Sequence, residues 1–223
     1  MSLSNAVWPD LVRDGLVLVP IGSTEQHGPH LPLDTDTTIA RAVADELAPL
    51  LGARVAAAVP YGASGEHQAF PGTISIGTEA LTHVLVELGR SLTQWVAQVV
   101  FVNGHGGNLK ALDAAVTLLR SEGRRISWVP CATPGSDLHA GRTETSLMLH
   151  LAPTRVRLAL AEAGNTEPLA HLMPRLRARG VASVSANGVL GDPAGASAAE
   201  GEELMRRMVS DAYDRVRTQV VVA

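Results

Sequence analysis

Cysteine, aromatic side chains and long apolar segments are all scarce in this chain of 223 residues. The single cysteine, Cys131, cannot form an internal disulfide. Because it follows an apolar run and has no neighbouring base, we expect a buried, inert thiol rather than a nucleophile. Apolar runs such as Leu16–Ile21 are far shorter than the roughly 18 residues that suggest a membrane span. No N-terminal stretch has the pattern of a secretion signal. We therefore expect a cytoplasmic protein without a membrane partner.

Positive charge is also in short supply. The chain has 18 Lys and Arg against 22 Asp and Glu, a formal net charge of −4. This balance argues against nucleic acid as a partner, because no basic face is available to neutralise phosphates. The local cluster of Arg175, Arg177 and Arg179 is more typical of a solvated helix face. Apolar side chains, in contrast, make up 46% of the chain, enough for a sizeable core in one domain over residues 1–223.

Short apolar runs alternate with amphipathic stretches, a pattern typical of parallel sheets with helices on their faces. The predicted strands are Leu16–Ile21, 55–59, 99–103 and Ile126–Pro130. The predicted helices are 37–51, 109–122, one that starts near Glu144 and is ended by Pro153, and one whose apolar stripe runs from Leu81 to Trp95. The sequence therefore predicts an α/β fold with a mostly parallel central sheet.

Helix ends and one irregular region complete this outline. Asn108 is expected to cap the helix that follows it, and Ser197 followed by Glu200 has the spacing of a capping box for a last helix. Residues 155–195 contain helical stretches broken by prolines and glycines. We expect that region to cover the site or an interface.

The histidines are unevenly distributed along the predicted elements. Those in Gly- and Pro-rich segments that follow predicted strands are His27, His30, His67, His105 and His139, whereas His83, His150 and His171 lie on predicted helices. A single histidine in a loop is more often a surface or structural residue than a ligand. However, the binding crevice of an open α/β sheet lies beyond the carboxyl ends of its strands. Several histidines gathered there indicate a site.

The segment after the first predicted strand, 25–36, combines carboxylates with imidazoles. Glu25 and His27 are two apart and point the same way in extended backbone, and a chain that turns at the intervening prolines can bring Asp36 beside them. Oxygen and imidazole ligands together suit Zn, Mn or Fe rather than Ca. For Asp34 a role as helix cap explains the residue as well as a ligand role does, whereas we interpret Asp36 as a ligand.

A glycine-rich segment, 103–108, separates the third predicted strand from a helix. Its glycines would let the backbone approach a bound group closely, so one interpretation is a phosphate cradle in a non-catalytic binding protein. A phosphate loop would carry Lys or Ser/Thr after the glycines, where this chain has Asn108 and Leu109. We therefore favour His105 as a metal ligand.

The third segment, 136–146, follows the fourth predicted strand and contains His139 and Glu144. An acidic residue in the first turn of a helix ordinarily stabilises the helix dipole, but the nearby histidine makes Glu144 a candidate ligand. Three carboxylates and two imidazoles exceed the needs of one metal, so we predict two divalent ions (Zn, Fe or Mn) that activate water and polarise a carbonyl. His139, not needed as a ligand, is the candidate acid or base for a leaving nitrogen, and we expect Glu144 to take part in catalysis with it.

Three ordered motifs resemble those of the creatininase (creatinine amidohydrolase) family. They are E-Q-H-G-P-H-L-P-L-D-T-D at 25–36, N-G-H-G-G-N at 103–108 and H-A-G-R-T-E-T-S at 139–146, with F-P-G-T at 70–73. The resemblance implies a three-layer α/β/α domain, a binuclear metal site and a homo-oligomer, a hexamer or a similar assembly. Carried over to this chain, it implies that Glu25 and His105 bind one metal, that His27 binds the other and that Asp36 bridges the two.

Two departures from the family pattern bear on the substrate. Creatininases carry a carboxylate two residues after the histidine of N-G-H, and this chain has Gly107 there, which makes Glu144 the natural substitute. The tryptophans that creatininases use around their flat substrate have no match either, since Trp8, Trp95 and Trp128 lie outside the site segments. We therefore expect a metal-dependent amidohydrolase whose substrate is not creatinine.

The runs 22–36 and 61–77 look most like the mycofactocin-system branch of the family. That likeness implies a peptidase that removes a C-terminal Val-Tyr dipeptide from a modified precursor peptide during the biosynthesis of a redox cofactor. Glu66, His67 and Gln68 would then face the substrate, although an ordinary surface loop explains them equally well. The alternative is a sibling amidohydrolase that acts on a small cyclic amide or formamide.

Overall fold

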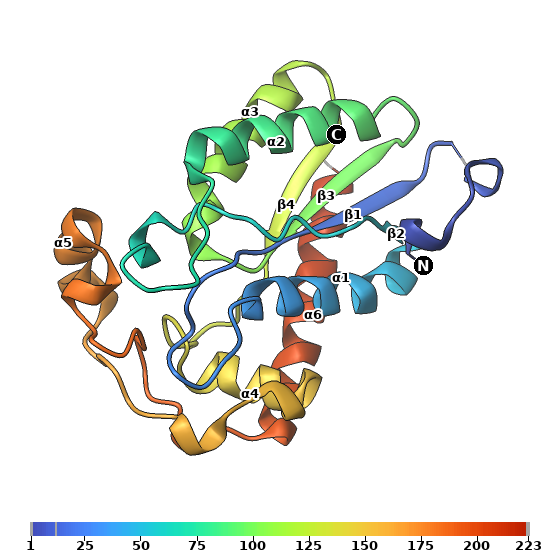
Figure 1. Ribbon diagram of the computed structural model, residues 1–223. Coiled ribbons are helices and arrows are strands. Elements are labelled where there is room, and N and C mark those ends of the chain that lie inside the picture. The colour runs from blue at the N-terminus through green and yellow to red at the C-terminus, as the bar shows by residue number, and fades with distance from the viewer. Residues whose placement is uncertain (1, 12, 222–223) are drawn as a thin grey trace.

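Residues 2–11 and 13–221 are described by a computed structural model (Figure 1). In this part of the chain, four parallel strands form a sheet in the order β2-β1-β3-β4. The strands are β1 (Leu16–Ile21), β2 (Arg54–Val55), β3 (Gln98–Asn103) and β4 (Ile126–Pro130). The α-helices are α1 (Thr35–Leu51), α2 (Gly77–Leu92), α3 (Leu109–Ser121), α4 (Arg142–Leu151), α5 (Leu169–Arg179) and α6 (Ala198–Val221).

Helices cover both faces of the sheet, with α2 and α3 on one face and α1, α4 and α6 on the other (Figure 1). The alternation of side chains along each strand explains the two cores. In β3, Phe101 is buried against α2 and α3, whereas Val100 and Val102 are buried in the opposite layer. The predicted α/β fold, with helices on both faces of a parallel sheet, is confirmed.

The carboxyl ends of three strands lie side by side. In the parallel ladders Ile21 is paired with Asn103, and Asn103 is paired with Pro130. The loops that leave β1, β3 and β4 therefore start from one edge of the sheet, where open α/β sheets bind their ligands. These loops carry most of the three segments that the sequence singles out.

The second predicted strand, 55–59, is wrong in extent. Regular pairing with β1 stops at Val55, although the backbone N–H groups of Ala56 and Val59 still donate to β1. In a regular strand, residues whose N–H groups point to the same neighbour are two apart. Ala56 and Val59 are three apart, so the ladder is interrupted between them. Helix α1 begins at Thr35 rather than at residue 37, and α2 ends before Trp95, which packs against the core from the following turn.

Asn108 occupies the predicted N-cap position of α3 but does not act as a cap through its side chain, which makes no capping hydrogen bond. Instead, its amide accepts from the Ala63 N–H at 2.9 Å and donates to the Gly22 carbonyl at 3.0 Å. The side chain thus joins three loops. The Ala63 N–H and the Gly22 carbonyl are buried, and buried backbone groups require hydrogen-bond partners.

The predicted capping box at the start of α6 is half formed. The Ser197 hydroxyl accepts a hydrogen bond from the Glu200 N–H at 3.2 Å. The Glu200 carboxylate, however, does not return to the Ser197 N–H. It accepts from Arg142 at 2.9 Å and from the Ser146 hydroxyl at 2.8 Å, and thereby joins α6 to α4.

Residues 155–195 fold back over the site loops, as the sequence predicts. Leu172 of α5, Val181 and Leu190 form a small third core, and Phe70 packs against it. The backbone of Leu190 is paired with that of His139, with N–H to carbonyl distances of 3.2 and 2.9 Å. This region therefore covers part of the edge at which the site lies.

Candidate metal centre

The loop between β1 and α1 folds back on itself. The Glu25 N–H donates to the Leu33 carbonyl at 2.9 Å. Gly28 stands at the turn with φ of 63°, a left-handed conformation that favours glycine. The fold-back brings Asp36, in the first turn of α1, beside Glu25 and His27.

Asp36 lies at the centre of a buried cluster. Its carboxylate oxygens are 3.0 Å from His27 Nε2 and 3.2 Å from His105 Nδ1, and the Ser23 hydroxyl donates to it at 2.8 Å. Although burial alone would raise its pKa, the two imidazoles hold the pKa of Asp36 well below its usual range. Asp36 is therefore an anion that joins histidines from two different loops.

Glu25 is a buried carboxylate that lacks donors. Neither of its side-chain oxygens accepts a hydrogen bond from any residue that the structure describes. The nearest polar atoms are His105 Nε2 at 3.2 Å and His67 Nε2 at 3.3 Å. Burial raises the pKa of Glu25 to about 7. A buried carboxylate without donors is costly unless a cation compensates it, so the residues fit a metal ion here.

The donor atoms form three overlapping groups, two of which share only Asp36. In each group the atoms lie within 4.8 Å of one another. The inner triad consists of Glu25, Asp36 and His105, and the outer triad consists of His27, Asp36 and Glu144. A third group, Glu25, His27 and His139, overlaps both. The protein thus has a buried cluster of His, Glu and Asp side chains that can hold metal.

Glu144 faces the cluster from the first turn of α4 and also accepts a hydrogen bond from the backbone just before that helix. Its Oε2 accepts from the Ala140 N–H at 2.6 Å and lies 3.8 Å from His27 Nε2. The side chain is 20% exposed, unlike Glu25, which is fully buried. Burial raises the pKa of Glu144 to about 7. The helix-end role and the site role considered for Glu144 are therefore compatible.

His27 and His105 lie beside carboxylates that favour the protonated, charged imidazole. Burial alone would lower the pKa of His27, but Asp36 and Glu144 raise it to about 10. In the same way, Glu25 and Asp36 overcome burial and raise the pKa of His105 to about 9. A metal ion would replace these protons, because imidazole must be neutral to act as a ligand. Two buried carboxylates beside His105 also disfavour an anion, which speaks against a phosphate cradle in this loop.

His139 is neutral and packed among the other histidines. Its ring centroid is 4.3 Å from that of His27 and 4.4 Å from that of His67. Its Nε2 lies 2.8 Å from the Gln26 backbone carbonyl. Burial, followed by the neighbouring His27 and His67, lowers the pKa of His139 well below its usual value. The ring is thus held in place without charge beside the cluster.

The segment 66–68 divides between the cluster and the surface. It lies in a single 3-10 turn, η3 (Gly65–His67), and the residue that follows. His67 is buried inside the cluster, whereas Glu66 is one-third exposed with Oε1 at 3.6 Å from His105 Nε2, and Gln68 is exposed. Burial, followed by the neighbouring His105 and His27, lowers the pKa of His67 to about 3. An ordinary surface loop does not describe His67.

Gly107 has no room for a side chain. A Cβ atom there would come within 2.6 Å of Glu66 Oε1, and it would also collide with the His105 ring. The space next to Gly107 is therefore taken by a carboxylate from another loop. Glu66 and Glu144 both reach the cluster, and neither comes from the segment that carries His105.

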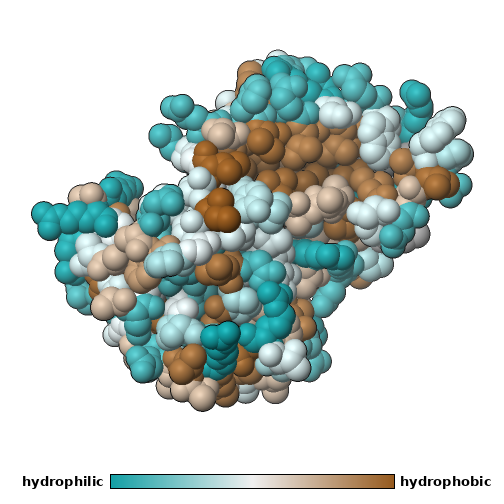
Figure 2. Space-filling view, in the orientation of Figure 1, coloured by the Kyte–Doolittle hydropathy of each residue, from teal (hydrophilic) through white to brown (hydrophobic). Residues whose placement is uncertain are grey.

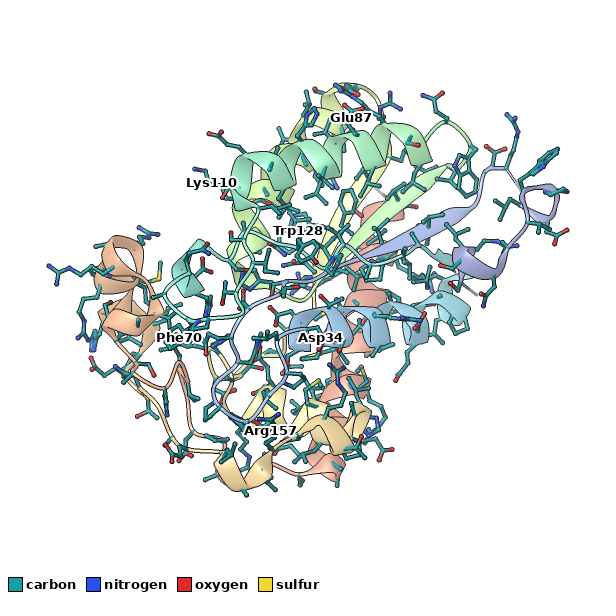
Figure 3. The ribbon with its side chains drawn as sticks, in the orientation of Figure 1. Asp34, Phe70, Glu87, Lys110, Trp128 and Arg157 are labelled. Atoms are coloured by element: carbon teal, nitrogen blue, oxygen red, sulfur yellow. The ribbon has the colours of Figure 1, made fainter. Side chains whose placement is uncertain are left out.

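Other candidates lie outside the cluster. Asp34 takes neither of the roles open to it, since its side chain makes no capping hydrogen bond and pairs with Arg155 at the surface. Figure 3 labels Asp34 at the start of α1, across the β1–α1 loop from Phe70. The His30 ring is bonded to the Thr145 hydroxyl at 2.8 Å. Burial raises the pKa of the Cys131 thiol, in agreement with an inert role.

The three tryptophans are remote from the cluster, as expected. Trp8 is 84% exposed, Trp95 packs against the core beside α2, and the Trp128 indole donates to Asp113 of α3 at 2.9 Å.

Sequence reasoning missed several polar residues that support the cluster. Ser64 lies with its hydroxyl 3.3 Å from His105 Nε2, and Thr73 accepts from the Gln26 N–H at 3.1 Å. Gln26 itself contacts two histidines. The available signal was the position of Gln26 between two predicted ligands, although its partners are 41 and 113 residues away.

Comparisons with known proteins agree with this geometry. The family model for creatinine amidohydrolase matches residues 4–216. The mycofactocin precursor peptide peptidase of Mycolicibacterium smegmatis is 59% identical over 208 residues, which cover 91% of this chain and 84% of that protein. A mutant creatininase of the Zn-Zn type has a TM-score of 0.81 at 26% identity, over 98% of this chain and 97% of that chain. A creatininase described with Mn has a TM-score of 0.80 at 26% identity, over 98% of each chain. The chain therefore belongs to the creatininase family and is a metal-dependent hydrolase of C–N bonds.

Proposed function

We propose that this chain is a peptidase that releases a C-terminal Val-Tyr dipeptide from the modified mycofactocin precursor peptide. The observation that carries this proposal is the 59% identity, over 91% of the chain, to a protein named for that activity. The absence of site tryptophans, within the described part of the chain, supports a substrate other than creatinine.

The proposed site holds two divalent ions. The inner triad would bind one ion through Glu25 and His105, the outer triad would bind the other through His27 and Glu144, and Asp36 would bridge them. The mixture of oxygen and imidazole donors supports Zn, Fe or Mn, and the solved relatives include Zn-Zn and Mn forms. The buried oxygens of Glu25, which lack donors, support the inner position most directly.

When bound, the pair of cations would supply Lewis acidity toward the scissile carbonyl and toward water. His139 is neutral at working pH, so it can accept a proton from the attacking water and donate it to the leaving amide nitrogen. In this step the C–N bond breaks, the water oxygen joins the carbonyl carbon, and the proton moves to the amine. Glu144 lies in the same cluster and is proposed to take part in the reaction as well as to hold the outer ion.

The substrate is proposed to enter past the segment 66–68. Glu66 and Gln68 are the side chains of this segment that reach solvent, and they would contact the peptide. His67 is buried, so its part would be to support Glu25 rather than to touch the peptide backbone directly.

The test is incubation with the modified precursor peptide after chelation and reloading with Zn, Mn or Fe. We expect Val-Tyr release, detected by mass spectrometry, only in the metal-loaded protein. Asp36→Asn should abolish release, whereas Gln94→Glu, an exposed change remote from the cluster, should leave it unchanged. If the loaded protein leaves the peptide intact and hydrolyses a small cyclic amide or formamide instead, the sibling activity is the correct one.

A homo-oligomer, a hexamer or a similar assembly, also belongs to this proposal. Figure 2 shows a broad apolar area beside α2, in the upper part of the view, and large exposed apolar patches mark interaction surfaces. Val84 of α2 is 37% exposed. Sedimentation analysis at micromolar concentration should find an assembly larger than a monomer, and a monomer would contradict this part of the proposal.

Location and domain organisation stay predictions. Within the described ranges no helix combines the length and apolar character needed to cross a bilayer. We propose a cytoplasmic protein with one domain over residues 1–223, and a proteolysis experiment that yields two stable folded fragments would contradict the second statement.

A further inference from the structure

The side chain of Gln26 is buried at the meeting point of three loops, and its orientation is fixed. Its Oε1 accepts from the Gly28 N–H at 2.9 Å. An N–H group can only donate, so this contact identifies the amide oxygen and leaves Nε2 as the donor on the other side. The amide of Gln26 therefore has one possible orientation.

The donors and acceptors around Nε2 can then be counted. The amide nitrogen has two hydrogens, and three atoms lie close to it: His67 Nδ1 at 2.9 Å, the Gly188 carbonyl at 3.0 Å and His139 Nε2 at 3.0 Å. His139 Nε2 also lies 2.8 Å from the Gln26 backbone carbonyl, which can only accept. If His139 Nε2 carries a proton and donates it there, the two amide hydrogens are left for His67 and Gly188. Every hydrogen then has an acceptor.

We propose that Gln26 is a positioning residue that fixes the tautomers of two site histidines. His67 accepts at Nδ1, so its proton is on Nε2, which faces Glu25 Oε1 at 3.3 Å. His139 donates from Nε2, so its Nδ1 is unprotonated and faces the same oxygen at 3.7 Å. His67 thus supports the carboxylate of the inner triad, and His139 presents a lone pair to the cluster. The role in catalysis rests on the proposed function, whereas the tautomers do not.

Burial and backbone geometry keep this arrangement in place. His67 and His139 are both buried, so their ring nitrogens depend on these protein partners. Gly188 has φ of 82°, and a Cβ atom there would collide with the Gln26 side-chain amide. Glycine at 188 therefore leaves the space that the Gln26 amide occupies.

The proposal can be tested on the metal-free protein without substrate. Long-range ¹H–¹⁵N correlation spectra of histidine-labelled protein distinguish the two tautomers. We expect both His67 and His139 to carry the proton on Nε2. In Gln26→Glu the amide donor becomes an acceptor, so His67 should move its proton to Nδ1 while His139 keeps its own. The exposed change Gln94→Glu, which alters charge equally, should move neither.

Kinetics of the metal-loaded protein separate positioning from substrate binding. Gln26→Glu should lower kcat about tenfold or more, as loss of a supporting partner at a metal site usually does, with little change in KM. If Gln26→Glu does not fold, Gln26→Met provides the test, because it removes the donor and should leave His67 in mixed tautomers. A wild-type His67 protonated on Nδ1, or an unchanged His67 tautomer in either variant, would overturn the proposal. Such a result would not affect Val-Tyr release by the wild-type protein.

Discussion

Glu25 and Glu144 are both carboxylates at the edge of the same sheet, but their surroundings differ. Glu25 is fully buried, and neither of its oxygens has a hydrogen-bond donor among the described residues. Glu144 is 20% exposed, and its Oε2 already accepts from the Ala140 N–H. The inner triad therefore has more to gain from a cation than the outer triad.

Because the two carboxylates differ in this way, the two proposed metal positions need not be equivalent. A cation at the inner position would compensate a buried carboxylate that accepts no hydrogen bond from the described residues. A cation at the outer position would compete with the hydrogen bond that Glu144 accepts from the Ala140 N–H. We therefore expect the inner ion to bind more tightly and the outer ion to exchange more readily.

Asp36→Asn should have the largest effect, because Asp36 belongs to both triads. We expect the affinity for both ions to fall by at least about a hundredfold, because loss of a residue that only supports a ligand already costs about 10- to 100-fold. Calorimetry and elemental analysis measure this loss. Glu46→Gln, an exposed change on α1, is the matched control. Two ions bound with wild-type affinity in Asp36→Asn would contradict the assignment.

Paired variants of the two glutamates sharpen the comparison. Glu144→Gln should retain the inner ion and lose the outer one, whereas Glu25→Gln should lose the inner ion. In addition, Glu25→Gln should raise the melting temperature of the metal-free protein at pH 8 by about 3 °C, because a buried carboxylate without hydrogen-bond donors is removed. No such gain is expected for Glu144→Gln. Equal losses of metal and equal shifts in melting temperature in both variants would contradict a difference between the inner and outer positions.

The stability of the metal-free protein should fall as pH rises from about 7 to about 10, above the range in which unfolding would protonate His67 and His139. The pKa values of Glu25 and Glu144 are raised to about 7, and those of His105 and His27 to about 9 and about 10. In this window the folded state binds more protons than the unfolded state, so stability decreases with pH. We expect a drop of about 5 °C in melting temperature.

Metal binding should show the opposite dependence on pH. Ions displace these protons, so affinity should increase from pH 6 to pH 8, with proton release detected by calorimetry in buffers of different ionisation enthalpy. Metal binding without proton release would contradict the charged state of His27 and His105.

His139→Ala should have the smallest effect on metal content and a large effect on turnover. Both ions should remain, while kcat falls about 10²- to 10⁴-fold, the range for loss of a general acid or base. His83→Ala, an exposed change on α2, is the control. Loss of metal from His139→Ala would make His139 a ligand, for which the group of Glu25, His27 and His139 leaves room.

The fold and the loops of the site could be predicted from the sequence because their signals are local. Short apolar runs identify β1, β3 and β4, and parallel strands necessarily bring their carboxyl ends to one edge. The residues that follow those strands could be singled out for the same reason.

What escaped prediction depends on partners that are distant in sequence. The irregular path after Val55, the buried bonds of Asn108 and the contacts of Gln26 with His67 and His139 are decided by packing between loops. The burial of His67 also could not be read from η3, since it depends on the loop that carries Glu25. Local propensity carries no information about such contacts.

A metal-bound crystal structure with anomalous diffraction would test the central claim most directly. The account predicts two peaks about 3.5–4 Å apart, with Asp36 between them, Glu25 and His105 at the first, and His27 and Glu144 at the second. A single peak, or a second peak without Glu144 or Asp36 among its ligands, would contradict it.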